Sequence, residues 1–214
     1  MAEPKPSRRL PAAERRRQLL QTASKLFAEQ GYARTTTAQL AQQAGVTEPI
    51  IYRHFASKRD LFVALVEETG STTLKIWQES LQTAKDPADR LEILLRQNPM
   101  IALGDEEANA YRVIIQSITE VDDSVIHKAV NEHFHALHDF LTAEVKNAQD
   151  AGEVRTRFPA EMIAWMLVDV ALGYGVMQAM GVRDTNRSSN GQPLSEIIGE
   201  ILLPNRAPSR GSEQ

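Results

Sequence analysis

Residues 31–62, GYARTTTAQLAQQAGVTEPIIYRHFASKRDLF, constrain the fold more than any other part of this chain. Gly31 follows a long amphipathic stretch, and helices commonly end at a glycine in the left-handed conformation. Gly45 allows a tight turn, while Thr47 and Pro49 stand where the next helix needs an N-cap and a first-turn residue. The spacing therefore predicts two short helices joined by a tight turn.

The first of these helices carries one apolar face. Leu40, Ala41 and Ala44 recur at helical spacing, and the small Ala41 lets the next helix cross closely. We expect Thr35 or Thr36 to cap this helix, because a threonine hydroxyl accepts a hydrogen bond from an otherwise unpaired amide.

The second helix has a buried side and an outer side. Ile51 and Phe55 are four residues apart and are expected to be buried together. The side chains left on or near the outer surface are Glu48, Pro49, Ile50, Arg53 and His54. Turn, caps and small residues all fit a helix-turn-helix whose second helix enters the DNA major groove. The alternative is an ordinary helical hairpin.

Charge is distributed unevenly along the chain. Residues 1–60 carry a net charge of +6 and residues 61–214 a net charge of −10. A basic head on an acidic body is expected when only one end of a protein meets phosphates. Arginines before or at the start of the first helix can enter the minor groove, or they form a solvated basic tail. These are Arg8, Arg9, Arg15, Arg16 and Arg17.

The first third of the chain also carries a family pattern. It consists of Leu20, Ala23, Leu26, Phe27, Gly31 and Tyr32, the threonine pair before the second helix, Ala44-Gly45-Val46, Tyr52-Arg53-His54-Phe55, Ser57-Lys58 and Leu61-Phe62. On these residues the chain resembles the DNA-binding domain of the TetR family of bacterial transcription regulators. The remainder is similar to the ligand-binding half of that family in the number, length and order of its helices.

The resemblance implies which residues meet DNA. In the family, the starts of the second helix and of the recognition helix face the bases, and a tyrosine, a histidine and a lysine contact phosphates. The phosphate-contact positions fall on Tyr52, His54 and Lys58 of this chain. The full set of expected DNA-binding residues is Thr36, Thr37, Ala38, Thr47, Glu48, Pro49, Ile50, Tyr52, Arg53, His54 and Lys58.

The base-facing residues have unusual chemistry. None of Ala38, Glu48, Pro49 and Ile50 makes the two-pronged contact of Arg with guanine or of Asn and Gln with adenine. Glu48 either accepts a hydrogen bond from a cytosine amino group or is a helix N-terminal charge stabilised by the macrodipole. Pro49 or Ile50 can touch a thymine methyl group. Specificity is therefore expected to depend partly on DNA shape and on the basic arm.

The rest of the chain reads as helical throughout, so we expect an all-α fold. The pattern predicts helices over about 58–84, 86–104, 105–118, 123–151, 159–181 and 193–203. We expect a flexible basic arm at 1–10, a helix-turn-helix domain at 11–57, a helical ligand-binding and dimerisation domain at 58–203, and a flexible tail at 204–214.

The helix predicted over 159–181 is apolar around much of its circumference. Such a helix either sits centrally or meets a second subunit, and this part resembles the dimerisation helices of the family. A symmetric homodimer would read a palindromic operator, whereas a wholly intramolecular core is the alternative. The interface candidates are Ala164, Val168, Ala171, Gly175, Met180, Ile197, Ile198 and Ile201.

Family resemblance also implies an inducer pocket among the middle helices. Large residues expected to line it are Trp77, Met100, Tyr111, Ile115, Phe134, Trp165, Met166, Tyr174 and Met177. Methionine and aromatic side chains favour a small hydrophobic effector, although each is also an ordinary core residue.

Other classes of protein find less support. The chain has no cysteine, no uninterrupted apolar run of about eighteen residues and no secretory signal, so a cytoplasmic protein without a membrane partner is expected. His133, His135 and His138 lack the spacing of a metal site, and no glycine-rich phosphate loop follows a strand. We therefore expect no cofactor, no metal and no enzymatic activity.

The sequence predicts a DNA-binding transcriptional regulator, acting as a repressor that a small hydrophobic ligand releases from a palindromic operator. Two alternatives remain open. One is a nucleoid-associated or partner-recruiting DNA-binding factor without an inducer, which a closed body lacking a pocket would favour. The other is an all-helical enzyme with a coincidental helical hairpin.

Overall fold

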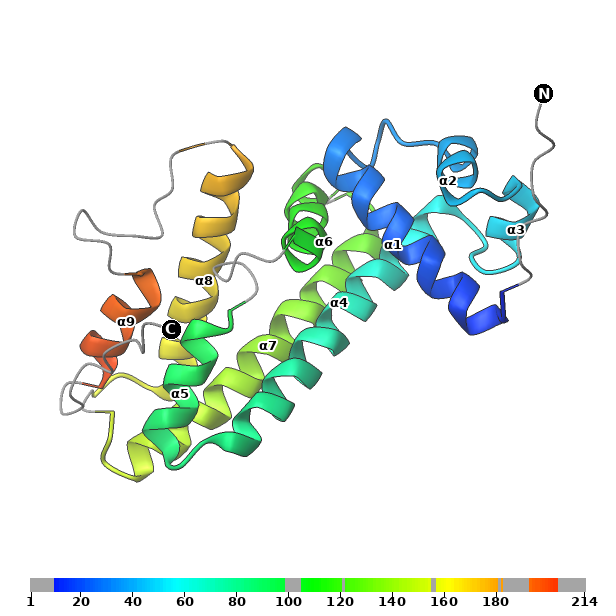
Figure 1. The fold of residues 1–214 in the computed structure, drawn as a ribbon. Coiled ribbons are helices and arrows are strands. Elements are labelled where there is room, and N and C mark those ends of the chain that lie inside the picture. Colours follow the sequence, from blue (N-terminus) through cyan, green and yellow to red (C-terminus); the bar gives the residue numbers. More distant parts are fainter. Residues whose placement is uncertain are drawn as a thin grey trace.

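The computed structural model describes residues 10–98, 105–120, 122–154, 157–180, 182 and 193–203, and its regular elements are all helical (Figure 1). The all-α fold predicted from sequence is confirmed. The α-helices are α1 (Ala12–Gln30), α2 (Thr37–Ala44), α3 (Glu48–Tyr52), α4 (Lys58–Ser80), α5 (Pro87–Arg96), α6 (Asp105–Gln116), α7 (Ser124–Asp150), α8 (Ala160–Ala179) and α9 (Leu194–Leu202). Two 3₁₀ turns follow α4 and α6, namely η1 (Leu81–Thr83) and η2 (Ser117–Glu120).

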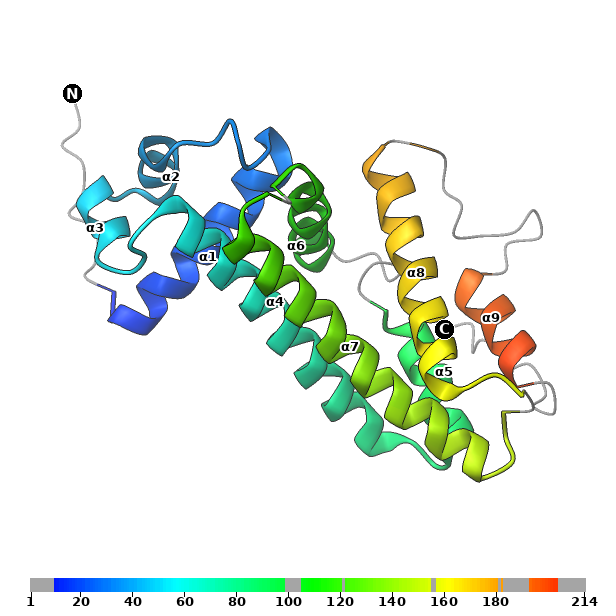
Figure 2. The same cartoon turned by 180° about the vertical axis from the view of Figure 1, so that it is seen from behind.

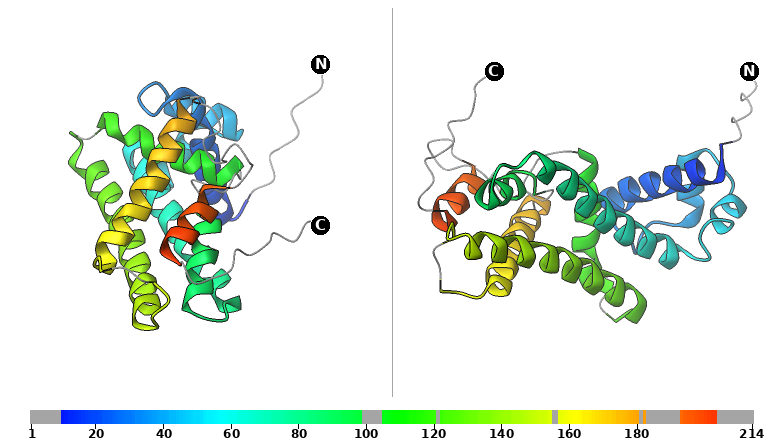
Figure 3. Two further views of the ribbon diagram at one scale, coloured as in Figure 1. Left: turned by 90° about the vertical axis from the view of Figure 1, so that its left-hand side faces the viewer. Right: turned by 90° about the horizontal axis from the view of Figure 1, so that it is seen from below.

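The molecule is elongated, with two ends joined by a pair of long helices. Helices α1, α2 and α3 form a head at one end, and α5, α8 and α9 gather at the other (Figures 1 and 2). Helices α4 and α7 lie side by side, and both run from the head toward the far end. Helix α6 lies between the head and the body and packs against α1. The view from below shows the same separation of the two ends (Figure 3).

A glycine turn and threonine hydrogen bonds, both encoded locally in the sequence, determine the shape of the head. Gly45 ends α2 in the left-handed conformation, with φ 66° and ψ 35°, and so makes the turn to α3. Thr36 is the residue that caps α2: its hydroxyl accepts from the amide of Gln39, whose side chain accepts in return from the Thr36 amide. Thr35 is instead buried, and its hydroxyl donates to the carbonyl of Gly31.

The core of the head continues into the body. Phe27, Tyr32 and Phe62 form an aromatic trio, with ring centroids 4.7 to 5.9 Å apart. The same apolar cluster extends through Ile114 of α6 and Ile126 of α7. The head is therefore not separated from the body by a break in packing at residue 57.

Several predicted helix ends agree closely with the structure, and others do not. Asp123 caps α7 by accepting from the amides of Val125 and Ile126, and Gly152 ends the same helix with φ 76°. The helix predicted to reach residue 104 ends at Arg96, and residues 99–104 lie outside the described residues. The proposed arm at 1–10 and tail at 204–214 also lie outside, apart from residue 10.

An ion pair joins two helices near the far end of the body. The Arg90 guanidinium donates two hydrogen bonds of 2.6 Å to the carboxylate of Glu144, which is buried. Arg90 also donates to the carbonyl of Leu81. Hydrogen bonding to the Glu144 carboxylate raises the pKa of Arg90. This two-pronged geometry fixes the register of α5 against α7.

Replacing Glu144 by Ala leaves the Arg90 charge half-buried without its partner. We expect the Glu144→Ala variant to lose about 3 kcal/mol of unfolding free energy, because breaking a buried pair strands the remaining charge. Chemical denaturation followed by circular dichroism measures the loss. The exposed pair of Lys75 and Glu79 gives the control, since Glu79→Ala should cost less than about 1 kcal/mol. Equal losses in the two variants would contradict this account.

Candidate nucleic-acid interface and body cavity

Helix α3 presents a short surface with few donors for DNA. Thr47 is the N-cap of α3 by its backbone conformation, but its side chain makes no capping hydrogen bond. Thr47 and Pro49 are exposed, and so is Ala38 at the start of α2, whereas Ile50 is half-buried. These predicted DNA-facing residues therefore share one end of the head.

A hydrogen-bonded chain links α2 and α3 on this surface. The hydroxyl of Thr37 lies 2.8 Å from Oε2 of Glu48 and 3.2 Å from the hydroxyl of Tyr52. Glu48 and Tyr52 are four residues apart and so share one side of α3. Three residues predicted to face DNA are thus connected to one another in the DNA-free protein.

Lys58 is engaged inside the head. Its ammonium group donates to the carbonyls of Tyr32, Ala33 and Thr35, at 2.9, 3.4 and 3.0 Å, and lies 4.4 Å from the centre of the Tyr32 ring. Partial burial lowers the pKa of Lys58. An ammonium has three N–H donors, and here all three meet carbonyls of the turn between α1 and α2. A phosphate contact by Lys58 would have to replace one of these bonds.

Two arginines near α3 differ in their availability. Arg16 stacks on the Phe55 ring, 4.5 Å from its centre, and donates to the carbonyl of His54. Arg53 is exposed at the C-cap of α3, and the side chain of His54 is half-buried. Of these two cations, Arg53 is the freer to meet a phosphate.

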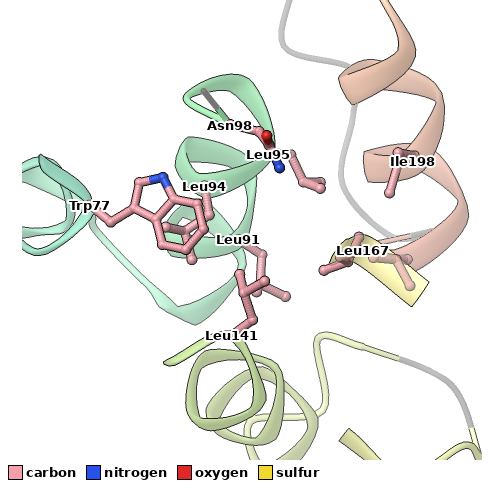
Figure 4. A pocket seen from close by; sticks show the side chains of 9 residues that line it. Trp77, Leu91, Leu94, Leu95, Asn98, Leu141, Leu167 and Ile198 are labelled. Atoms are coloured by element: carbon pink, nitrogen blue, oxygen red, sulfur yellow. The ribbon is translucent and has the colours of Figure 1, made fainter. Parts of the chain in front are cut away.

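The body contains a small apolar cavity at the end remote from the head. Its volume is about 20 Å³, and side chains from α4, α5, α7, α8 and α9 converge on it (Figure 4). The lining residues are Trp77, Leu91, Leu94, Leu95, Asn98, Leu141, Leu167, Ile198 and Leu202. A cavity of this size has room for about one water molecule, whereas a benzene-sized ligand occupies one of about 150 Å³. This cavity is therefore too small for an organic ligand in this conformation.

The predicted pocket residues are spread over several environments. Trp77 is the one that lines the cavity, while Tyr111 and Tyr174 are buried elsewhere. Met166 and Met177 lie on an exposed face of α8, away from this cavity, so their place in a ligand pocket stays a prediction. Ile115, Phe134 and Trp165 are half-buried, and Met100 lies outside the described residues.

The cavity leucines were missed because periodicity does not reveal which apolar faces meet. Leu91, Leu94 and Leu95 follow helical spacing within the helix predicted over 86–104, and Leu141 lies in the helix predicted over 123–151. That signal marks them as core residues. Only the crossing of five helices brings them to one cavity.

A buried polar side chain, His133, lies between α4 and α7, nearer the head than the leucine cavity. His133 is 5 % exposed, and neither of its ring nitrogens has a hydrogen-bond partner among the described residues. It packs against Tyr111, whose hydroxyl lies 3.1 Å from that of Thr73, and a β-carbon added to Gly70 would come within 2.7 Å of His133 Nδ1. Burial lowers the pKa of His133 to about 4. His133 lies four residues before the buried Leu137, on the same side of the helix, and this spacing is the sequence signal for its burial.

Two further histidines of α7, His135 and His138, lie at its contact with α8. His138 stacks on Trp165 at a centroid distance of 4.3 Å, and one ring nitrogen lies 3.1 Å from the carbonyl of Glu161. His135 meets the same indole edge-on. Trp165 therefore packs against two histidines of α7 and is not among the residues that line the cavity.

Helix α8 has an exposed methionine stripe, which we define as Met162, Met166, Met177 and Met180. The four are 39 % to 70 % exposed. By length and composition α8 could cross a membrane, and 39 % of its most apolar stretch, Ala160–Met177, is buried. Such a helix is weak evidence for a membrane, because core helices of water-soluble proteins pass the same test.

The predicted interface residues separate into two groups. Ala164, Val168, Ala171 and Ile198 are buried within the chain, so their assignment to an intersubunit surface is wrong. Met180 and Ile201 are exposed, at 70 % and 71 %, and Gly175 and Ile197 are half-buried. The buried group lies on the face of α8 and α9 that packs on α7 and α5. The exposed face of α8 is the methionine stripe.

A helix-turn-helix head on a long helical body defines a class of DNA-binding regulatory protein. The family described as bacterial regulatory proteins, tetR family, matches residues 19–65. The nucleoid occlusion factor SlmA of Marinobacter nauticus is 30 % identical over 141 residues, which cover 66 % of this chain and 69 % of that protein. The chain therefore belongs to the TetR family of bacterial regulatory proteins.

Two further comparisons extend this result. The HTH-type transcriptional activator FasR of Mycolicibacterium smegmatis is 31 % identical over 109 residues, 51 % of this chain and 49 % of that protein. The chain thus spans between about half and about two thirds of the length of these curated relatives. A transcriptional regulator from Saccharomonospora viridis, solved in complex with choline, superposes with a TM-score of 0.70 at 25 % identity. That match covers 80 % of this chain and 88 % of the other.

The buried imidazole makes stability depend on pH. The pKa of His133 is about 4 in the folded protein and about 6.5 when exposed. The folded state therefore binds fewer protons between these values, so its stability is complete above pH 6.5 and falls as the pH drops toward 4. His133 should cost the wild type about 3 kcal/mol of unfolding free energy as the pH falls from 6.5 to 4. We expect the His133→Phe variant not to show this part of the loss.

Urea denaturation of the wild type and the variant at pH 7.5, 6, 5 and 4 measures this difference. His127→Phe is the matched control, because His127 is exposed on the same helix and its replacement leaves the buried imidazole in place. Parallel pH profiles for wild type and His133→Phe would refute the assignment.

Proposed function

We propose that this protein is a homodimeric regulator that binds a palindromic operator through its two heads and acts in the cytoplasm. It represses by occupying the operator until a small effector changes the spacing of the heads. The observation that carries the proposal is the exposed α2–α3 surface at one end of a molecule whose opposite end bears an exposed apolar stripe. One surface suits DNA and the other suits a second copy of the chain.

The proposed DNA surface combines base-facing and phosphate-facing groups. Thr47, Ala38 and Pro49 are exposed at the starts of the two helices, where a groove-bound helix-turn-helix reads bases. Arg53 is exposed at the end of α3, toward the flanking phosphates, and Tyr52 is exposed one residue before it. Thr36, Ile50 and His54 complete this surface, and Lys58 supports it from within.

We expect Arg53→Gln to weaken operator binding about tenfold and to lower the slope of log K against log salt by about 1, because one released counterion is lost. Fluorescence polarisation at several salt concentrations measures both quantities. Lys75→Gln removes an equal charge from the exposed side of α4 and should change neither. An unchanged salt slope in Arg53→Gln would remove this residue from the phosphate contacts.

The proposed dimer surface is the methionine stripe of α8 together with Ile201 of α9. Large exposed apolar side chains at helical spacing are rare on monomers and suit an isologous interface. Gly173 lies exposed within the same face, and no atom lies near enough to meet a side chain there, so a second helix can approach closely. A four-helix contact between two copies would cover the apolar face of α8.

We expect Met166→Glu to convert the dimer to a monomer, because the interface would then bury an unpaired charge. The monomer should bind the operator about a hundredfold more weakly, since the two heads no longer act together. Analytical ultracentrifugation and polarisation measure the two effects. Ile118→Glu is the control, because Ile118 is 75 % exposed on η2, away from α8, and should remain dimeric. A dimeric Met166→Glu protein would disprove this interface.

The proposed effector site lies in the apolar packing between α4 and α7, from the leucine cavity toward His133. The cavity is small, so an effector would bind a more open body and shift the population toward it. Its apolar walls favour a hydrophobic effector, and the unpaired imidazole offers one hydrogen-bonding group in the same region.

The closed cavity also favours a second function. A DNA-binding factor that recruits a protein partner needs no internal pocket, and two specific observations support it: the volume of about 20 Å³ and the identity with the nucleoid occlusion factor. In that case the acidic body would carry the partner surface.

Thermal unfolding with a medium-chain fatty acid and with its methyl ester separates the two functions. An effector-responsive protein should show a higher Tm and release its operator, and Leu141→Phe should abolish both responses by filling the cavity while leaving operator binding intact. Operator binding that is unaffected by either probe would favour the partner-recruiting function.

A further inference from the structure

The chain of Tyr52, Thr37 and Glu48 crosses from α2 to α3 on the surface proposed to face DNA. The Thr37 hydroxyl lies 2.8 Å from Oε2 of Glu48, and the Tyr52 hydroxyl lies 3.2 Å from the Thr37 oxygen. Thr37 begins α2, whereas Glu48 and Tyr52 begin and end α3. The contacts therefore hold the first turn of one helix to both ends of the other.

The direction of these hydrogen bonds follows from the number of hydrogens. A carboxylate only accepts, so the single hydroxyl hydrogen of Thr37 is donated to Glu48. The Thr37 oxygen can then only accept from Tyr52, which donates its own hydroxyl hydrogen. The chain runs from Tyr52 to Thr37 to Glu48 and ends on the carboxylate.

This arrangement orients Glu48 and leaves half of its carboxylate available. Oε2 is occupied by Thr37, and Oε1 has no hydrogen bond within the part of the chain that the structure describes. The side chain is half-buried, at the first residue of the base-reading helix. A carboxylate oxygen oriented by Thr37 therefore stands at the start of α3.

We propose that Oε1 of Glu48 accepts a hydrogen bond from the N4 amino group of a cytosine in each operator half-site, and that Thr37 and Tyr52 are positioning residues for this contact. The proposal rests on the operator-binding function proposed above. In the major groove, guanine and thymine offer only acceptors at this position, which repel a carboxylate. Adenine pairs its amino donor with an N7 acceptor, whereas the cytosine amino group stands without one.

The two hydroxyls also explain how an acidic residue is tolerated near phosphates. They donate toward the carboxylate in sequence, which stabilises its negative charge and restricts its rotamers. A purely structural role would hold α2 against α3 in the same way, but it would not select a base. Base preference is therefore the property that separates the two roles.

The experiment begins with selection of operators from a randomised duplex by the full-length dimer. A C·G pair should be enriched at one symmetric position in each half-site, and its replacement by any other pair should weaken binding about tenfold. Glu48→Gln should move the preference at that position from cytosine to adenine, because a glutamine amide pairs with the N6 and N7 groups of adenine.

The positioning residues are tested with variants that conserve volume. Thr37→Val and Tyr52→Phe remove the hydroxyls and should reduce the discrimination for cytosine at least threefold, whereas Thr37→Ser should retain it. Glu29→Gln makes the same change of charge on an exposed part of α1 and should leave the base profile unaltered. Thermal unfolding of every variant confirms that the head is folded.

Each outcome decides a separate question. If an operator is enriched and the Glu48→Gln variant keeps the wild-type base profile, the cytosine contact is overturned and the proposed function still stands. A lower Tm in Thr37→Val with an unaltered base profile would show that the hydroxyl chain is structural only and overturn the positioning roles. Failure to enrich any sequence would overturn the operator-binding function itself.

Discussion

The packing of one continuous helix, α4, against both ends of the molecule is the constraint on which the rest of the structure depends. Leu61 and Phe62 in its first turns are buried in the core of the head. Further along, Thr73 hydrogen-bonds with Tyr111 of α6, and Trp77 packs against Phe140 of α7. An ion pair of 3.6 Å between Arg59 and Asp123 joins the starts of α4 and α7. A change in how α4 lies on α7 would therefore move the head, and this is the route by which the proposed effector would act on the proposed DNA surface.

The polar side chains of the head have internal partners before they meet DNA. Lys58 closes the turn after α1, Arg16 covers Phe55, and Thr37 supports Glu48. The net charge of +6 in residues 1–60 therefore overstates the charge that is free to contact phosphates. Binding to DNA exchanges some internal hydrogen bonds for external ones, so affinity reflects a difference between two sets of contacts.

The parts of the fold that depend on neighbouring residues were predictable from the sequence. The turn at Gly45 and the cap at Asp123 follow from local backbone chemistry, and the apolar stripes follow from helical periodicity. The cavity and the direction of Lys58 were not predictable, because each depends on which helix faces which. The exposure of Met166 was not predictable for the same reason, since an apolar residue on an all-apolar helix does not reveal whether it faces its own core or the surface.

Gly70 has a consequence for the mechanics of the whole molecule. A hydrogen atom is all that fits between its backbone and the His133 ring, so a side chain of α7 packs directly on the backbone of α4 there. Lys58 lies twelve residues away, or about 18 Å along a straight helix. A tilt of α4 about residue 70 by a few degrees would therefore displace the head by about 1 Å or more.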